Sequence, residues 1–231
     1  MGWGGEGENK GENKGENKIK HGLFVTFEGG EGVGKTTQIA RLRATLEAEG
    51  MQVCVTREPG GDSVSEAVRN LLLTSKLLTS EMTPRAELLL FLASRAQNVE
   101  YVIRPHLAKG AIVLCDRFID SSAAYQGFAR GLGMPEVAQL NTFATGGLTP
   151  DLTILLDIDP TIGLARQPDH NRMEDQGIAF HRLVREGFLV AAANEPTRFL
   201  VLDATRPTDS LQAEIYAQVR QLLDRVSRSN F

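Results

Sequence analysis

The segment Gly29–Thr36 has the residue types and spacing of a phosphate-binding loop. Its sequence Gly-Gly-Glu-Gly-Val-Gly-Lys-Thr fits the pattern G-x-x-x-x-G-K-[S/T], between an apolar run and a helical pattern. Glycines let successive backbone N–H groups point at one anion, and the helix that follows adds a favourable dipole. Lys35 can reach the β- and γ-phosphates of a nucleotide, and the Thr36 hydroxyl can ligate Mg²⁺. The predicted triphosphate-binding residues are Gly29, Gly30, Glu31, Gly32, Val33, Gly34, Lys35, Thr36 and Thr37.

Such a loop does not identify the reaction, because switches, motors and kinases all carry it. A guanine-nucleotide switch would be expected to show an Asn-Lys-x-Asp motif. The Asn-Lys pairs of this chain lie in its first 18 residues and are followed by Gly-Glu or Ile-Lys. The sequence therefore disfavours a switch.

Three further segments place charged and aromatic residues where apolar runs end or along one helix. They are Arg57-Glu58-Pro59-Gly60-Gly61, Phe91-x-x-x-Arg95, and Asp116-Arg117-Phe118 with the following Ser121-Ser122-x-x-Tyr125-Gln126-Gly127. Each has a plainer interpretation: Phe91 as a core residue, the arginines as surface ion pairs, Asp116 as a helix cap. Together with the phosphate loop, the three arginines predict a site for a second phosphate.

The elements that must position these residues alternate along the chain. Apolar runs predict strands at 23–28, 52–56, 111–116, 152–158 and 199–203. Helical spacing, capping residues and Pro at first helical positions predict helices at 34–49, 63–74, 84–103 and 208–226, and helix starts at 134 and 160. Strands that are apolar throughout and separated by helices indicate a five-stranded, doubly wound parallel sheet covered on both faces.

Composition bounds the remaining possibilities. The 231 residues suit one domain, and 42% hydrophobic with 23% charged residues is ordinary for a soluble globular chain. A net charge of −4 argues against a nucleic-acid or anionic-membrane partner. Two cysteines, Cys54 and Cys115, exclude a disulfide-rich scaffold and are interpreted as inert strand thiols. With no spanning or signal segment apparent, a cytoplasmic location is expected.

The first twenty residues differ from the rest of the chain. They contain three tandem copies of Gly-Glu-Asn-Lys and almost no apolar residues, a composition typical of disorder. We therefore divide the chain into a tail at 1–20 and a folded domain at 21–231.

The ordered set of motifs from Leu23 onward resembles the bacterial thymidylate kinases, nucleoside monophosphate kinases with a P-loop NTPase fold. The resemblance rests on Glu31 inside the loop, Arg-Glu-Pro-Gly-Gly, Phe-x-x-x-Arg, Asp-Arg-Phe and Ser-Ser-x-x-Tyr-Gln-Gly. Downstream, Asn171-Arg172-Met173-Glu174 and the segment from Phe180 to Phe188 are similar to that family's lid, here at about 165–176, and the helix after it.

The resemblance implies the reaction ATP + dTMP → ADP + dTDP, with Mg²⁺ as cofactor, and a homodimer. Glu31 would bind the 3′-hydroxyl of the acceptor, and Arg57, Arg95 and Arg117 its phosphate. Phe91 would stack on thymine, Ser122 and Gln126 would face the base edge, and Tyr125 would crowd the 2′ position. The implied catalytic residues are Lys35, Asp116, Arg117, Arg166 and Arg172, and the implied metal ligands are Thr36 and Asp116.

Two questions stay open at this point. The phosphate loop carries no basic residue before Lys35, so the lid would supply the cation, from Arg166 or Arg172. A cytidylate or guanylate kinase, or a P-loop ATPase with a degenerate acceptor site, would share the loop; ADP release that depends on a monophosphate separates the kinases from the ATPase.

Overall fold

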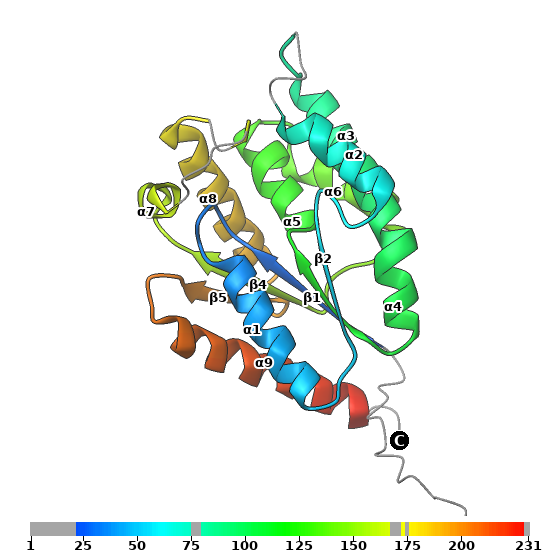
Figure 1. Ribbon diagram of the computed structural model, residues 1–231. Helices are drawn as coiled ribbons and strands as arrows, with labels where there is room; N and C mark the ends of the chain where they lie inside the picture. The colour runs from blue at the N-terminus through cyan, green and yellow to red at the C-terminus, as the bar shows by residue number, and fades with distance from the viewer. Residues whose placement is uncertain (1–21, 75–79, 167–171, 174–175, 229–231) are drawn as a thin grey trace, which may run out of the picture.

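Five parallel strands form one sheet in the order β2-β3-β1-β4-β5 (Figure 1). The computed structural model describes residues 22–74, 80–166, 172–173 and 176–228. The strands are β1 Leu23–Glu28, β2 Val53–Arg57, β3 Ile112–Asp116, β4 Leu152–Asp157 and β5 Phe199–Asp203. The predicted parallel sheet is confirmed, and each strand lies within one or two residues of its predicted place. The predicted tail at 1–20 and residues 167–171 and 174–175 of the lid lie outside the described residues.

Helices cover both faces of the sheet (Figure 1). On one face, α1 and α9 lie side by side. On the other face, η2, α4, η3 and α8 pack, with α2, α3 and α6 beyond them. The helices are α1 Lys35–Ala48, α2 Ser63–Leu73, α3 Pro84–Asn98, η2 Val99–Ile103, α4 Arg104–Ala108, α5 Ile119–Ser122, η3 Ala123–Ala129, α6 Met134–Thr145, α7 Pro160–Ala165, α8 Ile178–Asn194 and α9 Thr208–Arg228.

The two-residue period of the central strands divides the core. Leu23, Val25 and Phe27 of β1 pack in the cluster under α1 and α9, whereas Phe24 packs against η2 and Phe118 on the opposite face. β1 is buried along its whole length, and on this second face Phe24 alternates with the buried polar residues Thr26 and Glu28. The helices cover the two edge strands less completely, since Val55 of β2 is 42% exposed and Val201 of β5 is 45% exposed.

The helix predicted at 84–103 is interrupted. Its last turn, η2, has π-helical geometry and continues into α4, which carries Pro105 within its first turn. A second π-helical segment, η3, follows α5 and holds Tyr125 and Gln126; the sequence analysis had assigned no helix there. Single π turns of this kind occur at functional sites more often than elsewhere.

The carboxyl ends of the strands bring the motifs to one edge of the sheet. Phe27 of β1 pairs with Asp116 of β3, so the phosphate loop and the Asp116-Arg117 turn lie next to each other. β2 pairs with β3 on the other side, which puts Arg57 beside Asp116. None of the described helices is both long and apolar enough to cross a membrane.

Candidate active site

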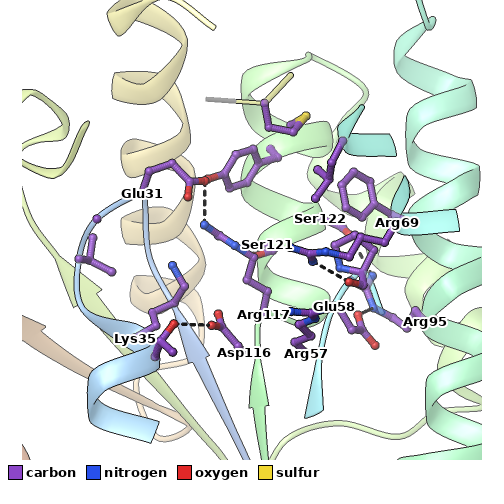
Figure 2. Close-up of a pocket in the computed structure, with 18 of the residues that line it drawn as sticks. Glu31, Lys35, Arg57, Glu58, Arg69, Arg95, Asp116, Arg117, Ser121 and Ser122 are labelled. Carbon is purple, nitrogen blue, oxygen red and sulfur yellow. Dashed lines mark hydrogen bonds and ion pairs between the residues drawn. The ribbon is translucent and has the colours of Figure 1, made fainter. Parts of the chain in front are cut away.

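One cavity of about 440 Å³ joins the phosphate loop to the arginine-bearing segments. Figure 2 shows Lys35 and Asp116 on one side, Glu58 and Arg95 on the other, and Arg117 between them. The lining residues named in the sequence analysis are Glu31, Gly32, Val33, Gly34, Lys35, Thr36, Thr37, Arg57, Phe91, Arg95, Asp116, Arg117, Ser122, Tyr125, Gln126 and Arg166. The structure thus gathers nearly all of the predicted site residues around one space.

The phosphate loop owes its shape to glycine and to packing against α7. Gly32 has a φ of 65°, and a Cβ placed there would lie 1.9 Å from the carbonyl oxygen of Gly163. Lys35 is buried and donates to the carbonyl of Gly30 at 3.0 Å. Burial lowers the pKa of Lys35, and the neighbouring charge of Arg117 lowers it further. The negative charge of a bound phosphate would raise the pKa of Lys35 and so offset both effects.

Thr36 and Asp116 lie together at this end of the cavity. The Thr36 hydroxyl donates to Oδ2 of Asp116 at 3.4 Å. Among the described residues no group of three or more acidic, His or Cys side chains is arranged to hold a metal ion. A hydroxyl and a carboxylate fit Mg²⁺, since this ion is usually bound by one or two protein oxygens together with phosphates and water.

Arg117 lies at the centre of the cavity in a conformation unusual for its type. Its φ is 68°, in the left-handed region that disfavours side chains with a Cβ. Its guanidinium donates to the carboxylate of Glu31 at 2.8 Å, to the carbonyl of Gly29 at 2.9 Å and to Ser121 at 3.3 Å. These bonds compensate the strain and direct the side chain across the phosphate loop.

Glu31 joins the loop to the acceptor side. Its Oε1 accepts from Arg117 and from the Tyr125 hydroxyl at 2.7 Å. Burial alone would raise the pKa of Glu31, but the charges of Arg117 and Lys35 outweigh it and lower the pKa to about 2. Glu31 is therefore a carboxylate at neutral pH, and within the described chain its Oε2 receives no hydrogen bond.

Arg69, which was not predicted as a site residue, also lines the cavity. Arg69 of α2 donates to the carbonyl of Pro59 at 2.8 Å. Burial lowers its pKa, and the charge of Arg57 contributes in the same direction. Arg57 itself pairs with the exposed Glu66 at 3.1 Å. Arg69 is four residues after Ser65, whose burial puts both on the inner face of α2, and the sequence carries no signal of this because position 65 is a serine.

Arg95 differs from the other arginines because four of its five N–H groups already have protein acceptors. It donates to Glu58 at 2.7 Å, to Ser122 at 2.9 Å, to the carbonyl of Phe118 at 2.8 Å, and to Asn141. Its side chain is 1% exposed. Arg95 has one N–H left for a ligand and otherwise builds the cavity wall.

The two candidate lid arginines have different surroundings. Arg166, at the end of α7, is exposed, lines the cavity, and lies 3.4 Å from the carbonyl of Gly32. Arg172 is bound elsewhere, to Glu87 at 2.7 Å and to the carbonyl of Leu72 at 2.7 Å. Only Arg166 of this pair is among the described residues that line the cavity.

A parallel α/β sheet whose phosphate loop shares one cavity with a cluster of arginines is the architecture of a P-loop nucleoside monophosphate kinase. Residues 27–215 match the family model for thymidylate kinase. The chain is 54% identical to the thymidylate kinase of Deinococcus radiodurans over 208 residues, which cover 88% of this chain and 98% of that protein. It is 47% identical to that of Solidesulfovibrio magneticus, over 87% of this chain and 100% of that protein. The crystal structure of thymidylate kinase from Ehrlichia chaffeensis superposes with a TM-score of 0.71 at 33% identity, covering 86% of this chain and 99% of that one.

The chain therefore belongs to the thymidylate kinase family, whose members phosphorylate dTMP to dTDP with ATP. The predicted fold, family and reaction are confirmed. The roles of individual residues, the metal and the assembly stay predictions.

Proposed function

We propose that the cavity holds ATP on the phosphate loop and dTMP along the arginine side, with the two phosphate groups meeting at Arg117. The observation that carries this proposal is the continuity of the cavity. Lys35 lies on one side and Arg95 on the other, with Arg117 between them (Figure 2), and Phe91 and Gln126 line the same cavity. A kinase must bring two polyanions into line, and such a channel lined with cations achieves that.

On the acceptor side, Arg57, Arg69 and Arg117 would hold the phosphate of dTMP. Planar guanidinium groups suit phosphate oxygens, and all three of these arginines line the cavity. Arg95 would contribute its one remaining N–H and keep Ser122 in place. The resting bonds of Arg117 to Glu31 would be exchanged in part for the phosphate.

The nucleoside would lie between Glu31 and the far wall. Oε2 of Glu31 suits the 3′-hydroxyl as an acceptor, and the Tyr125 ring beside it leaves little space for a 2′-hydroxyl. Phe91, half-buried on α3, would stack on the base. Ser122 and Gln126 would meet the polar edge of thymine.

The chemical step needs no general base. The attacking oxygen belongs to a phosphate whose second pKa is about 6, so it is already anionic at neutral pH. Lys35, Arg117 and Arg166 would neutralise the charge that spreads over the transferring phosphoryl group. Mg²⁺ held by Thr36 and Asp116 would, when bound with ATP, neutralise charge on the phosphate oxygens.

We further propose a homodimer that pairs through α3 and α6. These helices pack against each other and expose Leu89 (59%), Leu140 (40%) and Phe143 (88%), with Tyr101 (67%) of η2 nearby. Large apolar side chains grouped on adjacent helices are typical of an interaction face. Because ATP and dTMP are nucleotides of the cytoplasmic pool, the cytoplasm is the expected location.

The test is a coupled assay of ADP release with ATP–Mg²⁺ against dTMP, dUMP, UMP, CMP, AMP and GMP. We expect turnover to depend on the monophosphate and to be fastest with dTMP. Thymine and uracil differ by one methyl group, worth about 1 kcal/mol, so dUMP is expected as a poorer substrate. ADP release that is indifferent to every monophosphate would refute the proposal.

A further inference from the structure

Glu87 is a buried carboxylate behind the acceptor end of the cavity, and its partners come from three parts of the chain. It lies in the first turn of α3 and is 1% exposed. Its Oε2 accepts from Arg172 at 2.7 Å, and its two oxygens accept from Arg130 at 3.4 Å. Its Oε1 also accepts from the side-chain amide of Gln126 at 3.0 Å. A carboxylate is costly to bury unless it is paired, so the two arginines are what keeps Glu87 in place.

The hydrogen bond between Glu87 and Gln126 fixes the orientation of the Gln126 side-chain amide. A carboxylate flanked by two guanidinium groups can only accept hydrogen bonds, so the NH₂ end of the amide must face Glu87. The carbonyl oxygen is then the free end. Gln126 lines the cavity, and no described residue donates to that oxygen. The wall of the cavity therefore presents an acceptor at this position.

The same carboxylate is tied to the lid. Arg172 donates through Nε and its backbone N–H to the carbonyls of Leu72 and Leu73, at the end of α2. Arg130 donates to Gln176 at 3.2 Å and lies 4.6 Å over the ring of Phe180 in α8. Gln176 in turn donates to the carbonyl of Arg172. The end of the lid that leads into α8 is thus anchored on Glu87.

We propose that Glu87 is a positioning residue that sets base selectivity: it holds the Gln126 carbonyl toward the cavity, so that the site takes a pyrimidine whose N3 carries hydrogen and rejects one whose N3 is an acceptor. Thymine and uracil have this N3–H donor, and cytosine does not. Arg172 and Arg130 act through Glu87. The inference rests on the proposed placement of the base beside Gln126.

The test is the ratio of kcat/KM for dTMP to kcat/KM for dCMP in the wild type and in Glu87→Gln. A glutamine at 87 can donate as well as accept, so the Gln126 amide can turn and present its NH₂ group to cytosine N3. We expect the ratio to fall at least ~10-fold, the factor for one hydrogen bond made or lost, while the ratio of dTMP to dUMP stays within ~2-fold because both carry N3–H. The loss should appear in KM for dTMP more than in kcat.

Asp120→Asn is the matched control. Asp120 is also buried, 4% exposed, and pairs with Arg198 at 2.7 Å away from Gln126. Asp120→Asn should lower the melting temperature about as much as Glu87→Gln does, and should leave the dTMP/dCMP ratio unchanged. If Glu87→Gln does not fold, the test uses Arg172→Met instead. In that variant Arg130 is the remaining cationic partner of Glu87, and we expect the dTMP/dCMP ratio to fall ~3-fold or more.

The outcomes separate the inference from the proposed function. A wild type that does not prefer dTMP refutes the proposed function itself. A wild type that prefers dTMP, with an unchanged ratio in Glu87→Gln or in its replacement, overturns only the role of Glu87. An equal fall of the ratio in Asp120→Asn also overturns it, because the effect would then follow from general loss of stability.

Discussion

Replacing the two lid arginines separately should give very different kinetics. Arg166 lies at the phosphate loop and Arg172 is held by Glu87, so we expect Arg166→Met to lower kcat and Arg172→Met to affect mainly KM and stability. A guanidinium brought to about 4 Å from a phosphoryl oxygen gains about 4 kcal/mol at an effective dielectric constant near 20. That energy corresponds to a factor of about 10³ in rate. For Arg172→Met we expect a loss in kcat of less than ~10-fold.

The assay is steady-state ADP production with ATP–Mg²⁺ and dTMP, together with rapid-quench single turnovers, because product release can hide a slower chemical step. Arg166→Lys should recover part of the loss, since it keeps the charge and loses the fork of donors. Arg43→Met is the control, as Arg43 is an exposed arginine of α1 paired with Glu47. A loss near 10³ in Arg172→Met, with Arg166→Met within tenfold of the wild type, would refute this assignment.

Four other predictions follow from the structure. Arg95→Met should lower the free energy of unfolding by about 3–5 kcal/mol, because it leaves Glu58 buried without its cation. Adding Glu58→Gln to this variant should recover much of the lost stability. Denaturant titration measures the free energy of unfolding of both variants. Burial, with the charge of Asp120, raises the pKa of Glu28 from 4.5 to about 7. The folded state therefore favours the neutral form of the Glu28 side chain. Its contribution to the free energy of unfolding is present in full below pH 4.5 and is lost as pH rises through 7. Relative to Glu28→Gln, the wild type should lose a few kcal/mol between about pH 5 and 8, and a constant difference would contradict the reasoning. Phe143→Asp should give a monomer by light scattering if α3 and α6 form the interface. Deleting residues 1–20 should leave kcat and KM within ~2-fold, as the composition of that segment predicts.

The fold could be predicted because its signals are local and repeated. Each strand is a short apolar run bounded by glycine, proline or a polar turn, and each long helix has apolar spacing or a capping residue. A helix start was predicted at Pro160, for example, and there the Asp159 side chain accepts from the N–H of Thr161 at 2.8 Å. The segment 119–129 was missed, because its two short helical pieces contain neither a cap nor a helical apolar period that the sequence displays.

The site could be predicted as a set of residues but not as a set of partners. The motifs named Arg57, Arg95 and Arg117 together, and the structure places all three around one cavity. Arg57, Arg95 and Arg117 differ in the carboxylates that pair with them. These are Glu66 for Arg57, close in sequence, and Glu58 and Glu31, distant in sequence, for Arg95 and Arg117. No spacing rule reveals which of these pairs is buried.

The lid shows the same limit more sharply. In the sequence, Arg166 and Arg172 are two arginines of one loop with equal claims. What distinguishes them is Glu87, some eighty residues upstream on another helix. The choice between them as the arginine that acts on the phosphates therefore depends on the tertiary structure.

The pairing of cavity arginines with carboxylates explains how a chain of net charge −4 can bind two polyanions. Among the described residues that line the cavity, six side chains are cationic and three are carboxylates. A local surplus of positive charge therefore lies within an acidic protein. Low-dielectric walls concentrate that field at the cavity mouth and attract the nucleotides there. At rest, the carboxylate of Glu31 satisfies Arg117 and limits the cost of keeping it buried and strained. In the proposed function, an acceptor phosphate would compete for a guanidinium that is already in position, and so would gain a charge-assisted bond without first having to order the side chain.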